Sequence, residues 1–253
     1  GDLKMTIYGV LAEKKDAATY IAEALGTITK KDLKNGCIEV NQSILGGKAV
    51  ITWPDGHVVG LADMASYGDQ YAKWDLNNLP FLPAHYRFEV AKEGYKRKKF
   101  NNVKTALQAV DEIIIATDSD REGENIAYSI LLKAGLKSKI KWRLWYNSLQ
   151  KSEFQRAFRH LLPATKTYPY FVEAQTRQIA DWNVGINLTQ AYTLHLQQAH
   201  LKGTYTAGRV QSPVLAEVVR NDLAIRDFKA MPFYQLKGSH QVAPQQAIEF
   251  KHD

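Results

Sequence analysis

The sequence predicts an α/β fold in which a mostly parallel sheet is flanked by helices. Two similar units carry this prediction. In the first, the apolar run 7–12 leads into a turn at Glu13 and then into a helical stretch, 17–25. In the second, the wholly apolar run 113–116 leads into an acidic turn and then into a helical stretch, 125–133. Repeated strand–turn–helix units are typical of parallel sheets, whose ligands bind beyond the carboxyl ends of the strands. Both turns are therefore expected at one edge of the sheet.

Composition narrows the classes of protein to which the chain can belong. Of its 253 residues 45% are apolar, which excludes a disordered chain. Lysine and arginine number 33 against 26 acidic residues, and this net charge of +7 favours a polyanionic partner. The single cysteine, Cys37, excludes a disulfide framework and a multi-cysteine zinc site. No apolar run approaches the roughly 20 residues of a membrane-spanning helix, so we expect a cytoplasmic protein without a membrane partner.

The rest of the first 150 residues is expected to complete the sheet. Asp16 should cap the first helix and Gly26 should end it. Strands are predicted at 48–53, 58–61 and 88–90, and the aromatic stretch 69–83 should be irregular. The basic residues 96–99 are most simply a solvated loop, with a secondary contact to a polyanionic partner as the alternative, and a helix is predicted at 101–110. His57, a lone histidine beside a glycine turn, is more often structural than catalytic.

The character of the chain changes at about residue 151. Helices are predicted at 151–162, 170–185, 188–199 and 212–228, with prolines and glycines in the turns between them. Strands are then predicted at 233–236 and 247–250. The sequence therefore indicates three regions, with the bounds 5–150, 151–230 and 231–253, of which the second is all-helical.

The acidic turn is the most informative segment. It places four carboxylates within seven residues, those of Asp118, Asp120, Glu122 and Glu124. These carboxylates would repel one another unless a divalent cation or basic neighbours offset their charge. Hard oxygen ligands suit Mg²⁺. The alternative is an acidic loop at a helix N-terminus, where carboxylates are favoured in any case. The apolar strand that precedes the turn favours the metal site.

The segment 117–124 resembles the acidic motif of the Toprim domain in the type IA DNA topoisomerases, and the topoisomerase III branch is the most similar. Further segments resemble motifs of this family in the same order, over roughly residues 7–230. They are Leu11–Lys14, Thr52-Trp53 with Gly56-His57, Leu79-Pro80 with Leu82-Pro83, Asp181–Thr189 and Gly208–Pro213. The resemblance implies a Toprim domain at 5–150, a helical DNA-binding domain at 151–230, and the first strands of an incomplete β arch domain at 231–253.

The resemblance also implies roles for individual residues. Asp118, Asp120 and Glu122 would hold Mg²⁺, with Glu124 as a weaker candidate. Glu13 would donate a proton to the leaving sugar oxygen or act as a further metal ligand, and Lys14 would stabilise the developing phosphoryl charge. The residues expected to bind DNA are Arg177, Asp181, Arg209 and Gln211. Trp182 fits a DNA contact and a buried aromatic equally well.

The sequence departs from the family pattern at four positions. Lys15 and Ser119 stand where proline is common, and both changes are expected to alter loop stiffness more than chemistry. Ile179 and Gln190 stand where arginine is common, which removes two positive charges that could contact DNA.

Cleavage in this family requires a tyrosine nucleophile, which normally lies in a Tyr-x-Arg-Thr-like segment. None of the 13 tyrosines has that context. We therefore expect an N-terminal fragment that binds Mg²⁺, single-stranded DNA and negatively supercoiled DNA, but does not relax supercoiled DNA. The alternatives are a non-catalytic single-strand DNA-binding module and a different Toprim enzyme of the nuclease or primase type.

Overall fold

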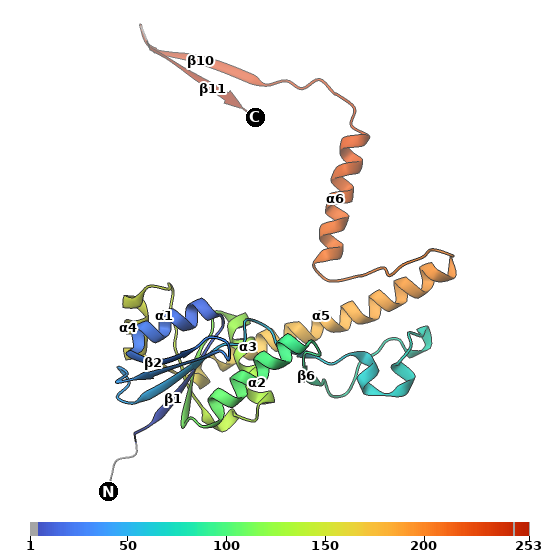
Figure 1. The fold of residues 1–253 in the computed structure, drawn as a ribbon. Coiled ribbons are helices and arrows are strands. Elements are labelled where there is room, and N and C mark those ends of the chain that lie inside the picture. The colour runs from blue at the N-terminus through green and yellow to red at the C-terminus, as the bar shows by residue number, and fades with distance from the viewer. Residues whose placement is uncertain (1–4, 245, 253) are drawn as a thin grey trace. The chain divides into compact units, whose positions relative to one another are not determined.

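The computed structural model describes residues 5–244 and 246–252 of the chain. The chain divides into two compact units, and the boundary between them in the sequence follows Gly208. The first unit contains the sheet and its helices (Figure 1). The second contains one helix and a two-stranded hairpin.

The elements have the following bounds. The strands are β1 (Ile7–Ala12), β2 (Thr27–Asp32), β3 (Cys37–Asn41), β4 (Lys48–Thr52), β5 (Val59–Leu61), β6 (Phe88–Val90), β7 (Glu112–Ala116), β8 (Ile140–Arg143), β9 (Leu162–Pro163), β10 (Leu236–Ala243) and β11 (Gln246–His252). The α-helices are α1 (Lys15–Leu25), α2 (Gly94–Gln108), α3 (Arg121–Lys133), α4 (Lys151–Arg159), α5 (Ala164–Gln198) and α6 (Gln211–Arg226). Short 3-10 helices lie at Met64–Tyr67, Asp69–Tyr71, Leu76–Asn78 and Lys137–Lys139.

The main sheet has the strand order β2-β3-β4-β1-β7-β8-β9. Its four central strands, β4, β1, β7 and β8, run parallel to one another, and the outer strands pair antiparallel. The α/β fold with a mostly parallel sheet is thus confirmed. In the register of β1 and β7, Ala12 pairs with Ala116. The residues that follow these two strands therefore lie side by side at one edge of the sheet.

Helices cover both faces of this sheet (Figure 1). On one face, apolar side chains of α1 and α4, such as Ile21 and Phe154, pack against buried residues of the central strands. On the other face, α2, α3 and the start of α5 contribute Leu107, Leu131 and Phe171 to a second buried cluster that includes residues of β1 and β7. Burial on both faces explains why β1 and β7, the two innermost strands, contain continuous apolar runs without alternation.

Several boundaries differ from those predicted. Helix α3 begins at Arg121, four residues earlier than expected, because the side chain of Asp120 caps it by accepting the backbone N–H of Gly123 at 2.7 Å. The basic cluster 96–99 lies inside α2 and is not a loop. Lys14, and not Asp16, occupies the N-cap position of α1, whereas Gly26 follows the last helical residue as predicted. Strands β2 and β3 were not predicted, since β2 carries mostly polar, exposed residues.

Two predicted helices form the single 35-residue helix α5. Gly185 does not interrupt it, and an irregular segment between β5 and β6 packs along its side. The indole of Trp182 contacts the rings of Phe81 and Tyr86 edge to face, with centroids 5.9 and 6.1 Å apart. Asn187 fixes the same segment by binding both the N–H and the carbonyl of Phe81. Trp182 therefore has a structural role, in docking this segment onto α5.

In the second unit, α6 and the antiparallel pair β10–β11 follow the order predicted for the end of the chain. The strand predicted at 233–236 is misplaced, because β10 begins only at Leu236 and pairs from there to Ala243, whereas β11 extends the strand predicted at 247–250 in both directions. In the part of the chain that the structure describes, no helix is both long and apolar enough to cross a membrane.

A fully buried ion pair fixes the acidic turn to the sheet. Arg143, the last residue of β8, donates from Nε to Glu124 Oε1 at 2.5 Å, and both side chains have 0% exposure. Its Nη1 donates to the carbonyls of Thr117 and Leu144 at 2.7 and 2.8 Å, and its Nη2 to the carbonyl of Asp118 at 2.6 Å. One guanidinium thus binds the backbone that follows β7, at Thr117 and Asp118, and the backbone that follows β8, at Leu144.

We expect Arg143→Met to lower the free energy of unfolding by about 3–5 kcal/mol, because it leaves a buried carboxylate without its partner. Denaturant titration followed by tryptophan fluorescence measures this loss. The double variant Arg143→Met with Glu124→Leu should lose less than the single one, since it removes both charges. An equal or larger loss in the double variant would show that the orphaned carboxylate is not the cause.

A second stability prediction concerns Gly123, in the first turn of α3. A Cβ at this position would lie closer to the carbonyl oxygen of Asp118 than van der Waals contact allows. Gly123→Ala should therefore destabilise the protein by about 1–3 kcal/mol, measured by thermal denaturation. Gly94→Ala is the matched control, because Gly94 also lies in a first helical turn but has open space around its Cβ position. It should leave the melting temperature unchanged or raise it.

Candidate metal and nucleic-acid site

The turn after β1 places Glu13 and Lys14 at the carboxyl edge of the sheet. Glu13 is almost buried, and its Oε1 lies 3.0 Å from the amine of Lys14. The same amine lies 3.6 Å from Asp118 Oδ2, across the gap between β1 and β7. The hydrogen bond and charge of Glu13, with the charge of Asp118, raise the pKa of Lys14 above its usual value. The lysine is therefore a cation at neutral pH, between two carboxylates.

The turn after β7 is tightly wound. The hydroxyl of Thr117 donates to the carbonyl of Gly123 at 2.8 Å, and the N–H of Asp120 donates to the carbonyl of Asp118 at 2.9 Å. The N–H of Asp118 lies 3.4 Å from Glu13 Oε2, so the two turns are in direct contact. The prediction that β1 and β7 bring their acidic turns together is confirmed.

A pocket of about 540 Å³ opens between these turns and the segment after β8. Its lining includes Lys14, Asp118, Asp120 and Tyr146. Mg²⁺ is usually held by one or two carboxylates, with water and substrate phosphate completing its shell. The carboxylates of Asp118 and Asp120 fit this requirement. Among the described residues, however, no group of three or more His, Cys, Asp or Glu side chains is arranged as a ready metal cage.

Glu122 faces a different neighbour. Its Oε1 lies 2.7 Å from Nε2 of His57, in the turn after β4, and its side chain is 58% exposed. The backbone of that turn also reaches the site, because the N–H of Asp55 donates to the carbonyl of Glu13 at 3.1 Å. Lys99 of α2 holds the turn through an ion pair of 2.5 Å with Asp55. Glu122 as a metal ligand stays a prediction, and His57 is its partner in this structure.

The buried carboxylate of Glu124 is engaged elsewhere. It lies against Arg143 inside the protein and does not line the pocket between the two turns. Its place in the acidic motif thus serves the fold, which agrees with its being the weaker candidate for metal binding.

Arg177 and Asp181 lie one helical turn apart on α5, with Arg177 Nε 3.7 Å from Asp181 Oδ2. Together with Glu122 and His57 they line a second pocket, of about 440 Å³. Packing of α5 against α3 produces this arrangement, and Asn125 of α3 donates to Gln178 Oε1 at 3.1 Å across the contact. Two predicted DNA-binding residues are thus next to one predicted metal ligand.

Arg209 and Gln211 belong to the second unit. Arg209 lies in the turn before α6, and Gln211 is the first residue of that helix. A helix N-terminus suits phosphate binding, and their contact with DNA stays a prediction.

Sequence reasoning missed three residues that shape the site. Arg143 gave no signal, because no strand was predicted at β8; a cation buried at the end of a strand requires a buried partner. Ser119 was treated only as a departure from proline, although its Oγ accepts the backbone N–H of Tyr146 at 3.0 Å. Tyr146 gave no signal in the sequence, because its approach to Asp118 depends on the order of the strands.

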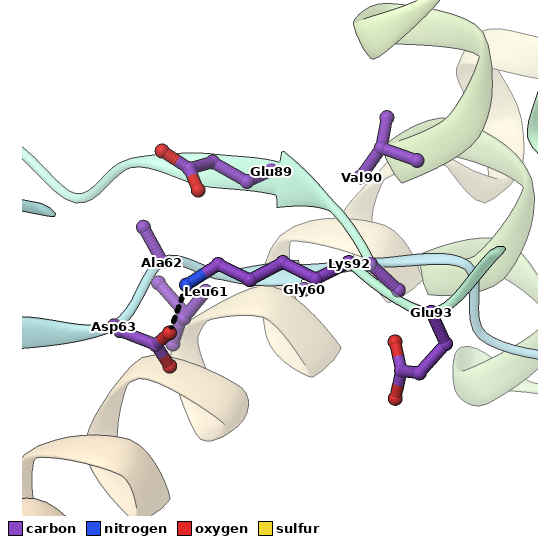
Figure 2. Close-up of a pocket in the computed structure, with 9 residues that line it drawn as sticks. Gly60, Leu61, Ala62, Asp63, Glu89, Val90, Lys92 and Glu93 are labelled. Atoms are coloured by element: carbon purple, nitrogen blue, oxygen red, sulfur yellow. Dashed lines mark hydrogen bonds and ion pairs between the residues drawn. The ribbon is translucent and has the colours of Figure 1, made fainter. Parts of the chain in front are cut away.

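A further pocket, of about 320 Å³, lies between β5 and β6 and includes none of the predicted site residues. Figure 2 shows Lys92 reaching across it to Asp63, with an ion pair of 2.5 Å. Glu89 and Glu93 also line it, so that its carboxylates outnumber its single cation. This charge does not suit a polyanion such as DNA.

The sequence of the chain matches two family models and several curated relatives. Residues 10–149 match the model of the Toprim domain, and residues 167–252 match a family model described as DNA topoisomerase. The chain is 38% identical to a DNA topoisomerase 3 of Bacillus cereus over 231 residues, and 39% identical to one of Shouchella clausii over 229. Each alignment covers 90% of this chain but only 29% of the relative. A DNA topoisomerase 3 of Bacillus subtilis is 34% identical, over 91% of this chain and 30% of its own length. The chain therefore belongs to the Toprim family, in the form found in the type IA DNA topoisomerases.

Proposed function

We propose that this chain is the metal-binding and single-strand-binding part of a type IA topoisomerase, which cleaves, passes and rejoins single DNA strands. One observation carries the proposal. Glu13 and Lys14 lie at the end of one parallel strand, and Asp118 lies at the end of its neighbour, within 3.6 Å of the lysine amine. An acid, a cation and a metal-binding carboxylate are thereby together at one sheet edge, where a phosphodiester can enter.

The proposed chemistry assigns a task to each group. Lys14, held as a cation by its two carboxylate neighbours, neutralises charge that develops on the scissile phosphate. Glu13, when it enters the reaction protonated, supplies a proton to the leaving sugar oxygen; the alternative role is that of a further metal ligand. Asp118 and Asp120, with Glu122 as a further candidate, hold Mg²⁺. The metal, when bound, adds positive charge beside the phosphate.

DNA is proposed to extend from this edge along α5. Arg177 contacts backbone phosphate, and Asp181 holds the guanidinium in place through their ion pair. Arg209 and Gln211, near the start of α6, are proposed to add phosphate contacts. This assignment keeps the division into a Toprim domain at 5–150, a helical DNA-binding domain at 151–230 and arch strands at 231–253.

The nucleophile is proposed to lie outside this chain. No tyrosine here stands in a Tyr-x-Arg-Thr-like context, and the chain spans only 29% of the length of its relatives. Negatively supercoiled DNA, which exposes single strands, is the proposed substrate of the whole enzyme.

Metal binding is tested by titrating Mg²⁺ into the purified chain in an isothermal calorimeter. Asp118→Asn and Asp120→Asn should each weaken binding on the order of tenfold or more, because the affinity of such sites depends on the number of charged ligands. Glu122→Gln should have a smaller effect, because its carboxylate faces His57 in the structure.

Asp16→Asn is the matched control for this experiment. Asp16 lines the same pocket but belongs to the first turn of α1 and not to the acidic turn. Its loss should change the affinity for Mg²⁺ by less than about twofold. Equal weakening by Asp16→Asn and Asp118→Asn would mean that the metal senses only general negative charge, and the assignment of the ligands would be wrong.

DNA binding is tested by fluorescence anisotropy with a labelled oligothymidylate over a range of salt concentrations. Arg177→Gln should weaken binding and reduce the slope of log K against log[salt] by about 0.7, the value for one phosphate contact on a single strand. Arg159→Gln is the control, since Arg159 is exposed on α4, outside both site pockets. An unchanged slope for Arg177→Gln would contradict a phosphate contact.

The same preparation separates the alternatives. Binding of DNA that needs no Mg²⁺ and survives Asp118→Asn, with no metal bound at the acidic turn, would favour a non-catalytic binding module. Cutting or primer synthesis by this chain with Mg²⁺ would favour another Toprim enzyme. Relaxation of supercoiled DNA by the pure chain would contradict a nucleophile outside it.

A further inference from the structure

The segment after β8 is joined to the acidic turn by two hydrogen bonds that involve consecutive residues of that turn. Ser119 Oγ accepts the backbone N–H of Tyr146 at 3.0 Å. The hydroxyl of Tyr146 lies 3.3 Å from Asp118 Oδ1 and 3.4 Å from the carbonyl oxygen of Ala116, and it donates to either. Backbone and side chain of one tyrosine are therefore both engaged with the turn.

The ring of Tyr146 is held rigidly. Only 6% of the residue is exposed, and the ring packs against Phe154 of α4 with centroids 4.9 Å apart. Three residues before it, Arg143 fixes the chain by binding the carbonyl of Leu144. Because the ring cannot turn away without leaving the core, its hydroxyl occupies one defined place on the wall of the pocket.

This arrangement gives the two oxygens of Asp118 different surroundings. Oδ1 lies beside the tyrosine hydroxyl, and Oδ2 lies 3.6 Å from the amine of Lys14. The side chain of Asp118 is 47% exposed, and it lines the pocket. A carboxylate held at one oxygen by a neutral donor keeps its charge and presents its other lone pairs to the pocket.

We propose that Ser119 and Tyr146 form a positioning pair that orients the Asp118 carboxylate for a divalent cation. The inference rests on the proposed metal site at Asp118. Ser119 holds the backbone of Tyr146 in register with the turn, and the tyrosine hydroxyl then sets the rotamer of the aspartate. The serine thus does by hydrogen bonding what a proline at that position would do by restricting the turn.

The test uses the purified chain with Mn²⁺ as a probe, and free Mn²⁺ is measured by electron paramagnetic resonance. Tyr146→Phe keeps the buried ring and removes only the hydroxyl. It should weaken Mn²⁺ binding about tenfold, as is usual when the partner of a metal ligand is lost. Ser119→Ala should also weaken Mn²⁺ binding. Ser119→Thr, which keeps the hydroxyl, should bind Mn²⁺ with the affinity of the unaltered chain.

Tyr128→Phe is the matched control. Tyr128 is also buried, and its hydroxyl also donates to a backbone carbonyl, that of Ala164, at 3.1 Å, away from the turn. It should lower the melting temperature about as much as Tyr146→Phe but leave Mn²⁺ affinity within about twofold. This comparison separates positioning of the carboxylate from general stability.

The outcomes are distinct. Unchanged or tighter Mn²⁺ binding by Tyr146→Phe, in a chain whose binding is lost in Asp118→Asn, would overturn the positioning pair and leave the metal site standing. Equal weakening by Tyr128→Phe would also overturn it. A chain that binds no Mn²⁺, or binds it equally after Asp118→Asn, would overturn the metal site and the pair together.

Discussion

The geometry of the acidic turn depends on the buried guanidinium of Arg143, which forms an ion pair with Glu124 and hydrogen bonds to the backbone of the turn. The loop 117–120 carries carboxylates and exposes carbonyl oxygens to the protein interior, and such groups are costly to bury without donors. Arg143 supplies donors to the carbonyls of Thr117 and Asp118, and its charge is balanced by Glu124. The acidic motif therefore contains carboxylates that face the pocket, those of Asp118 and Asp120, and one carboxylate, that of Glu124, that neutralises the buried arginine. The pair holds the loop firmly enough for Asp118 and Asp120 to stay in place despite their mutual repulsion.

The order of the parallel strands is the second constraint. Because β4, β1, β7 and β8 are neighbours and run in one direction, the loops after all four reach the same edge of the sheet. Each loop contributes something different: His57 from the first, Glu13 from the second, Asp118 from the third and Tyr146 from the fourth. Hydrogen bonds link the loops sideways, such as that from the N–H of Asp55 to the carbonyl of Glu13. The site is thus shared by four segments that are far apart in the sequence.

Much of this was predictable from local patterns. The apolar runs at 7–12 and 113–116 predicted two buried parallel strands, and the acidic turns that follow them predicted a shared edge. Sequence patterns could not show that Arg143 is paired with Glu124, since that contact depends on which strand lies beside β7. They also divided α5 at Gly185, because glycine has a low helix propensity. The helix nevertheless continues through Gly185, since the packing of Trp182 and Asn187 on either side of it outweighs that propensity. Strand β2 was missed for a similar reason: it is paired at the edge of the sheet but carries polar side chains.

Helix α5 is long enough to contact two parts of the first unit, the pocket beside Glu122 and the segment between β5 and β6. At 35 residues it measures roughly 52 Å, from the rise of 1.5 Å per residue. Arg177 and Asp181 line the pocket beside Glu122, and the next residue, Trp182, is embedded in the aromatic contacts of the segment between β5 and β6. Trp182 directly follows Asp181, so its indole is attached to α5 next to a residue that lines the pocket. It is one of five tryptophans in the chain, and it is the intrinsic fluorophore that adjoins this pocket in the sequence of α5.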